Sequence, residues 1–201
     1  MLELFLKGGV LMYPLLLCTV IAVAVILERG IQFLRAGSGL GWLQEAQIMI
    51  RNRAFSEAAA FAKTQSGPVA LLLGEVIEHR DLPRSELETR LSSVGSKELK
   101  RLSVRLHLLE LIGKIAPMLG LSGTVLGLTR TFQTVAAVQN IANPGLLAHG
   151  IWEALITTVT GLFIGIPTLV FHHLLENQLK SLSFEMKSSA ETMLTELGGS
   201  G

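Results

Sequence analysis

One glutamate stands out among the side chains that could carry chemistry. Glu153 is the only Asp, Glu, Lys or Arg between Arg130 and Glu176, in a stretch that is otherwise apolar, small or weakly polar. A carboxylate inside an apolar membrane helix is costly, and such a residue usually faces a protein interior or a watery path. At helical spacing Thr157 lies on the same face as Glu153, whereas Thr158 points about 140° away. Carboxyl and hydroxyl groups along one face can hold water and relay protons.

A structural role is the alternative for this carboxylate. A negative charge near the N-terminus of a helix is favoured by the helix dipole, and Glu153 lies early in its apolar segment. The residue pattern alone leaves the proton-relay role and the structural role open.

A second apolar segment carries small residues and one central hydroxyl on a single face. Small residues let helices approach closely in lipid, so plain helix packing is the preferred interpretation of the glycines. Thr124 lies in the middle of this face and could line a polar path. The glycines predicted to pack helices are Gly120, Gly123 and Gly127 of this segment and Gly161 of the third.

Motifs typical of enzymes are missing from the sequence. It contains no P-loop, no Gly-x-Ser-x-Gly, no His-Glu-x-x-His and no Cys-x-x-Cys, and Asp81 is its only aspartate. His149 precedes Glu153 by one turn without a matched nucleophile, so an intramembrane hydrolase is poorly supported. Adjacent His172 and His173 do not share a helix face, and no metal or other cofactor is predicted. The net charge of +1 gives no general attraction to nucleic acid.

The composition indicates a membrane protein. Only 16% of the 201 residues are charged, against about a quarter in soluble domains, and the mean hydropathy is +0.50. Residues 8–27 form an uncharged run whose helix would be about 30 Å long, the thickness of a hydrocarbon core. A signal peptide is the alternative for this run, but no cleavage pattern follows it. Two further spans are predicted at 108–138 and 146–173.

The distribution of Lys and Arg predicts the orientation. Twelve of the 17 lie between Arg29 and Arg105, whereas residues 134–150 carry no charge. By the positive-inside rule the long connection is cytoplasmic, so the N-terminus is outside and the C-terminus inside. We therefore expect an all-α, polytopic protein with three transmembrane helices and long helices that extend into the cytoplasm. Its regions are 1–28 (tail and first span), 29–107 (cytoplasmic helical domain), 108–138 (second span), 139–145 (external loop with the turn Asn143-Pro144-Gly145), 146–173 (third span), 174–197 (cytoplasmic helix) and 198–201 (a flexible end or remnant of an added tag).

Three local expectations concern the cytoplasmic domain. Residues 42–63 are predicted to form one helix, Gly67-Pro68 to break the pattern, and a second helical segment to run from Val69 to Arg80. Ser85 and Glu88 have the spacing of a capping box. The leucine periodicity after Ser85 shows no break, so one long helix is expected to run into the second span.

Two motifs resemble one known family. Residues 115–127 (IAPMLGLSGTVLG) resemble the second-span motif of the MotA/TolQ/ExbB proton-channel family, and residues 150–162 (GIWEALITTVTGL) with Ile166-Pro167 resemble its third-span motif. The three-span layout is more similar to ExbB and TolQ than to the four-span MotA type. Trp152 and Arg130 depart from the family pattern, and Arg130 could snorkel to the outer surface or bind a partner carboxylate.

The resemblance implies a bacterial inner-membrane, proton-driven motor. Family members form a homo-oligomeric ring, expected to be a pentamer, around a single-span partner of the ExbD/TolR type in the lipid bilayer. The motor then drives a TonB-like or TolA-like energy transducer. The resemblance places Glu153, Thr158 and Thr124 on the proton path, and the helix geometry adds Thr157. An ExbB-like role in TonB-dependent transport is preferred; the alternatives are a TolQ-like subunit of the Tol-Pal system and a non-conducting membrane scaffold.

Overall fold

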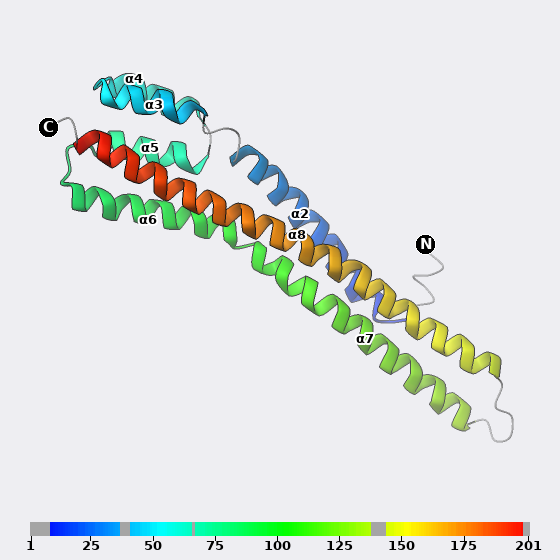
Figure 1. Cartoon of the computed structure of the whole chain (residues 1–201). Coiled ribbons are helices and arrows are strands. Elements are labelled where there is room, and N and C mark those ends of the chain that lie inside the picture. The colour runs from blue at the N-terminus through cyan, green and yellow to red at the C-terminus, as the bar shows by residue number, and fades with distance from the viewer. Residues whose placement is uncertain (1–8, 37–40, 66, 138–143, 199–201) are drawn as a thin grey trace. The chain divides into compact units, whose positions relative to one another are not determined.

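The computed structural model describes residues 9–36, 41–65, 67–137 and 144–198. All secondary structure in these ranges is helical (Figure 1), so the predicted all-α class is confirmed. The expectations for the tail before Gly9, for most of the external loop and for residues 199–201 fall outside the described ranges. The helices are α2 (Met12–Ala36), α3 (Gly41–Arg51), α4 (Phe55–Thr64), α5 (Pro68–Glu78), α6 (Arg84–Ser103), α7 (Leu106–Ala137) and α8 (Pro144–Gly198).

Three helices are long and apolar enough to cross a membrane, as the sequence predicts. Their apolar stretches lie within residues 12–33, 84–137 and 147–197. The chain divides into two compact units. We call residues 9–27 and 105–173 the spanning unit, and residues 28–104 and 174–198 the polar unit.

The spanning unit contains the start of α2, α7 and the first half of α8. Its core is small: Met12 and Leu15 of α2 pack on Ala116 of α7, with Leu119 and Ile164 beside them. Most of the large apolar side chains point outward, and Phe163 is 80% exposed. A helix that is apolar all round is typical of a membrane span, because its outer face meets lipid or other spans.

The α7–α8 seam of the spanning unit consists of small residues, which let the two backbones approach closely. A Cβ added to Gly161 would lie 2.5 Å from the Ala116 carbonyl oxygen and 3.0 Å from the Cα of Gly120. Both helices continue through a proline, Pro117 in α7 and Pro167 in α8.

The polar unit packs α3, α4, α5 and α6 with the second half of α8. Its fully buried side chains are aliphatic and include Ile50, Leu73, Val76 and Met193. Ion pairs join its helices at the surface: the Nε of Arg90 lies 2.8 Å from an oxygen of Glu75.

The predicted single helix over 42–63 is wrong, because α3 ends at Arg51 and α4 begins at Phe55. Arg53 has a φ of 56°, and the N–H of Ala54 donates to the carbonyl of Met49 over 2.9 Å. This is the Schellman end of a helix, which usually places glycine in the left-handed position. Arginine occupies that position here, so the sequence offers no glycine to mark the end.

The predicted capping box at Ser85 is also wrong. The helix begins at Arg84 after Pro83, no side chain caps it, and Ser85 lies within its first turn. Glu88 instead accepts a hydrogen bond from the Nε of Arg84 over 2.9 Å. This is an i,i+4 pair on the helix surface.

The expected continuous helix into the second span is interrupted between Ser103 and Leu106. The hydroxyl of Ser103 donates to the carbonyl of Lys100 over 3.0 Å, and the N–H of Val104 donates to the same carbonyl over 3.2 Å. A serine that competes for a backbone acceptor weakens a helix locally. Val104 keeps helical angles, so the interruption is confined to about one turn.

Two boundaries of the third span also differ from expectation. Pro144 and Gly145 are predicted to lie in a turn, but they form the first residues of α8. Proline suits the first helical position, because its missing N–H would have no partner there. The segments 146–173 and 174–197 are parts of one continuous helix.

Candidate functional site

Glu153 lies next to a small pocket inside the spanning unit. The pocket has a volume of about 30 Å³. This is room for about one water molecule. It is lined by residues 9–11 before α2, by Gly123, Gly127 and Arg130 of α7, and by Glu153 and Thr157 of α8. Glu153 itself is half-buried, so its carboxyl group has both protein and open surroundings.

The turn that precedes α2 comes directly against the Glu153 side chain. Gly9 has a φ of 69°, and a Cβ added to it would lie 3.2 Å from Oε1 of Glu153. The carbonyl of Gly9 accepts the N–H of Met12 over 3.2 Å, which starts the helix. A left-handed φ favours glycine, and here the missing side chain also leaves space for the carboxylate.

Thr157 shares the pocket with Glu153, as helical spacing suggests. It is 2% exposed, and its hydroxyl donates to the main-chain carbonyl of Glu153 over 3.2 Å. The side chain faces Gly123 of α7, where a Cβ would collide with it. Thr157 therefore combines a packing contact in the seam with a hydroxyl one turn from the carboxylate.

Thr158 and Thr124 lie apart from the pocket, whose lining includes neither of them. The hydroxyl of Thr158 donates to the carbonyl of Gly120 over 2.9 Å, a hydrogen bond from α8 to α7. The hydroxyl of Thr124 donates over 2.6 Å to the carbonyl of Leu121 in its own helix. The four predicted pathway residues thus fall into two groups, with Glu153 and Thr157 at the pocket.

The four glycines predicted to pack helices lie at the α7–α8 seam. A Cβ on Gly120 would lie 3.0 Å from the carbonyl oxygen of Thr157, and one on Gly127 would lie 3.0 Å from the Cβ of Ala154. Gly123 and Gly161 are equally close to the opposite helix. The seam holds Thr157 and Thr158 against α7, and Glu153 lies one turn before them.

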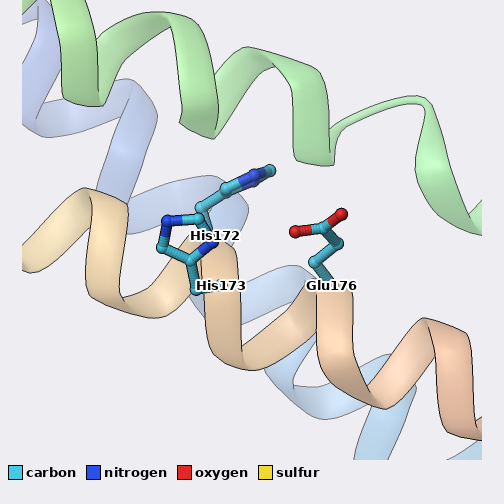
Figure 2. Close-up of side chains that lie close together, drawn as sticks. All are labelled: His172, His173 and Glu176. Atoms are coloured by element: carbon cyan, nitrogen blue, oxygen red, sulfur yellow. The ribbon is translucent and has the colours of Figure 1, made fainter.

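A histidine pair lies further along α8. Figure 2 shows His172, His173 and Glu176 on neighbouring turns of this helix, and their potential ligand atoms lie within 4.8 Å of one another. The sequence predicts no metal site at this pair, because adjacent residues point to different faces. The two ring centroids are nevertheless 5.3 Å apart. Nδ1 of His172 lies 3.0 Å from the carbonyl oxygen of Leu106, so this ring also has a packing role at the start of α7.

Sequence reasoning missed two contributors to the Glu153 pocket. It places Gly9 inside the uncharged run 8–27 that it predicts as the first membrane helix, whereas α2 begins only at Met12, and it places Arg130 at the outer surface. The Gly8-Gly9 pair is the available signal, because paired glycines before a helix mark a tight turn. No residue pattern indicates that this turn contacts residue 153.

Comparison with known proteins identifies the family. The family model described as the MotA/TolQ/ExbB proton channel family matches residues 55–188. A "Putative biopolymer transport protein ExbB-like 1" of Synechocystis sp. is 33% identical over 196 residues, covering 92% of this chain and 74% of that protein. "Biopolymer transport protein exbB1" of Vibrio cholerae is 30% identical over 171 residues, covering 83% of this chain and 75% of that protein.

A "Tol-Pal system protein TolQ" of Pseudomonas aeruginosa is also similar, over a shorter stretch. It is 40% identical over 78 residues, which cover 39% of this chain and 33% of that protein. The family match spans both motifs, the α7–α8 seam and Glu153. This chain belongs to the MotA/TolQ/ExbB proton channel family, whose members energise transport from the membrane.

Proposed function

We propose that this chain is the ring-forming subunit of an inner-membrane, proton-driven motor of the ExbB kind. In this proposal a homo-oligomer, expected to be a pentamer, surrounds a single-span ExbD/TolR-like subunit. Proton flow through the assembly then drives a TonB-like energy transducer. The observation that carries the proposal is one carboxylate, Glu153, beside a water-sized pocket in a helix long enough to cross a membrane.

The proton-path assignment follows from the chemistry of that site. Glu153 is the only acidic residue on α8 before Glu176. A carboxylate is costly in lipid, so one inside a membrane span usually has a function. Thr157 adds a hydroxyl that lines the same pocket. Thr158 and Thr124 lie in or beside the α7–α8 seam, and we place them on the path as residues that act after the carboxylate.

The orientation completes the proposal. The polar unit carries most of the Lys and Arg, and the positive-inside rule puts such a unit in the cytoplasm. The N-terminus is then outside and the C-terminus inside. The chain's similarity to ExbB proteins covers most of its length, whereas the similarity to TolQ covers less than half. This coverage favours TonB-dependent transport over the Tol-Pal system.

Proton flux tests the proposal. The chain and its cognate single-span partner are reconstituted in liposomes, and dye-reported flux is compared between the wild type and Glu153→Gln. We expect flux to fall at least tenfold in the mutant while the complex still assembles, because the amide cannot carry the proton. Glu110→Gln is the matched control, since Glu110 lies on α7 and pairs with Lys114 at 2.5 Å.

One result would contradict a proton path through Glu153, and another would contradict the motor itself. Equal flux in the wild type and Glu153→Gln would leave Glu153 with a structural role. Loss of the complex in Glu153→Gln, with no flux in the assembled wild type, would favour the membrane scaffold. Co-purification of the partner with each variant separates these outcomes.

A further inference from the structure

A group of side chains that can bind a metal ion lies on α8, outside the Glu153 pocket. It consists of His172, His173 and Glu176, each of which offers one nitrogen or oxygen atom, and these atoms all lie within 4.8 Å of one another (Figure 2). The three residues occupy consecutive turns of one continuous helix. Their arrangement therefore follows from the geometry of that helix.

Glu176 is the residue that makes one group of the two histidines. Adjacent positions on a helix are turned about 100° from each other, so His172 and His173 alone do not share a face. Glu176 follows His172 by four residues and His173 by three. Both spacings make neighbours on a helix surface. The carboxylate can thus approach both rings, whose centroids are 5.3 Å apart. The order His-His-x-x-Glu therefore lets three ligands converge where the histidine pair alone would not.

The packing of the spanning unit orients one of these ligands. His172 is 6% exposed, and its Nδ1 lies 3.0 Å from the carbonyl oxygen of Leu106. A carbonyl oxygen can only accept a hydrogen bond, so Nδ1 carries the hydrogen and donates it. In the neutral ring Nε2 then has the lone pair that a metal ion needs. A hydrogen bond from the other ring nitrogen to a backbone carbonyl is a usual support of a metal-binding histidine.

The other two ligands can adjust to an ion. His173 is exposed and Glu176 is half-buried, so neither side chain is held tightly by packing. Bonds of about 2.0–2.2 Å place the ligand atoms of a tetrahedral zinc ion about 3.3 Å apart. The atoms of this group need to approach one another by at most about 1.5 Å to reach that spacing. Rotation of the two less buried side chains is enough for this.

Lys180 is the cation that competes for the site. Its Nζ lies 2.9 Å from Oε1 of Glu176, in an exposed pair at i,i+4 spacing. Exposed pairs of this kind are weak, and the lysine side chain is long and flexible. A divalent ion carries twice the charge and also gains two imidazole ligands. The ion should therefore displace the lysine from the carboxylate.

We propose that His172, His173 and Glu176 form a binding site for Zn²⁺ on α8. Two imidazole nitrogens and one carboxylate oxygen are a ligand set that zinc favours, and three protein ligands leave a fourth position for water. The bound ion joins two turns of the helix and stabilises it locally. The site involves neither Glu153 nor proton flow, so it goes beyond the proposed function.

The experiment is a titration of the full chain with zinc. The protein is purified in detergent without a histidine tag, and binding of zinc chloride is followed by isothermal titration calorimetry. The ligand variants are His173→Gln, Glu176→Gln and His172→Asn, whose amide can still donate to the Leu106 carbonyl. The matched controls are Glu185→Gln, which removes another half-buried carboxylate of α8, and His149→Gln, which removes an exposed histidine of the same helix.

We expect the wild type to bind one zinc ion per chain with micromolar affinity. Each ligand variant should bind at least about tenfold more weakly, because even residues that only support a metal ligand contribute about 10–100-fold. Both controls should bind like the wild type. The site is overturned if the wild type binds no zinc, if the exposed variants His173→Gln and Glu176→Gln bind as tightly as the wild type, or if a control loses as much affinity as they do.

Two further measurements test the chemistry of the site. Lys180→Gln should bind zinc at least about twofold more tightly, because it removes the competing ion pair. Lys187→Gln, an exposed lysine further along α8, should not. Unchanged or weaker binding in Lys180→Gln would overturn the competition. Excess magnesium should leave zinc binding unchanged, because Mg²⁺ prefers oxygen ligands. Displacement of zinc by magnesium would overturn the histidine ligation.

Discussion

The internal packing of the two units of this chain depends on different forces. In the spanning unit, α7 and α8 meet through glycines and a hydroxyl-to-carbonyl hydrogen bond, and the large apolar side chains point outward. In the polar unit, aliphatic side chains are buried and ion pairs lie at the surface. The hydrophobic effect drives the packing of the polar unit in water, whereas in lipid there is no hydrophobic driving force between helices.

This difference explains where chemistry is possible. Close backbone approach leaves little room, so the water-sized space at Glu153 has a defined shape and few polar groups. The polar unit has many charges. Most of them face solvent and contribute mainly to solubility and modest stability, whereas Arg29 is buried. A single substitution should therefore act much more strongly in the seam than in the polar unit.

The largest contrast is expected between two glycine-to-alanine changes. Gly161→Ala would place a Cβ 2.5 Å from the Ala116 carbonyl oxygen, whereas a Cβ on Gly74 of α5 would have no neighbour within 4 Å. Overpacking of this kind costs about 1–3 kcal/mol. In a free helical position alanine instead stabilises by about 0.5–1 kcal/mol.

The two variants should thus move the free energy of unfolding in opposite directions. The measurement is unfolding of the purified protein in increasing sodium dodecyl sulfate, followed by circular dichroism. Gly30→Ala serves as a second open position, since nothing lies within 4 Å of its Cβ. If Gly161→Ala were as stable as Gly74→Ala, close backbone contact would not be what holds α7 to α8.

A smaller effect is expected from the hydrogen bond across the seam. Thr158→Val keeps the shape of the side chain but removes the donor to the Gly120 carbonyl. Hydrogen bonds between membrane helices contribute about 0.6 kcal/mol on average and about 1–2 kcal/mol at most. Thr160→Val is the matched control, because its hydroxyl bonds to Ile156 within its own helix.

Stability and flux together separate the two roles of Thr158. A destabilisation of about 1 kcal/mol with normal flux would assign this residue to helix packing alone. Loss of flux beyond that seen in Thr160→Val, restored by Thr158→Ser, would place its hydroxyl on the proton path. Equal stability of both valine variants would contradict the interhelical bond.

The helices of the spanning unit are well predicted from the sequence, because apolar length and missing charge are local properties. Glu153 is also found in this way, since a lone carboxylate in an apolar run is visible without a fold. The errors in the polar unit arise where residues adopt conformations that their types do not favour. Arg53 ends a helix in a left-handed conformation, and Ser103 weakens one by bonding to a backbone carbonyl.

The places of Gly9 and Arg130 in the site could be found only from the tertiary structure. Gly9 and Arg130 are far from Glu153 in sequence, and only the packing of α7 and α8 with the turn before α2 brings them to one pocket. Helical spacing predicts Thr157 beside Glu153, and the structure places it in the pocket. The α7 partner of Thr158 is a backbone carbonyl, which no residue pattern reveals.

The smallest effect is expected from an ion pair in the polar unit. Nε and Nη2 of Arg51 lie 3.0 and 2.5 Å from the two carboxylate oxygens of Glu196. This hydrogen-bonded pair lowers the pKa of the Glu196 carboxyl and raises the pKa of the Arg51 guanidinium. Because the folded pKa of Glu196 is the lower one, the pair stabilises above the unfolded value of about 4.3 and loses its effect as pH falls through the folded value.

Glu196→Gln should therefore be slightly less stable than the wild type at neutral pH, and the difference should vanish in acid. It should also shrink in high salt, because both groups are exposed to solvent and screened. Glu191→Gln, an exposed position on the same helix, is the control. Two outcomes would contradict this expectation: a loss of stability in Glu196→Gln as large as that in Gly161→Ala, or a loss that persists below the folded pKa of Glu196. Either would mean that charge rather than aliphatic burial holds the polar unit together. The contrast between the two units would then disappear.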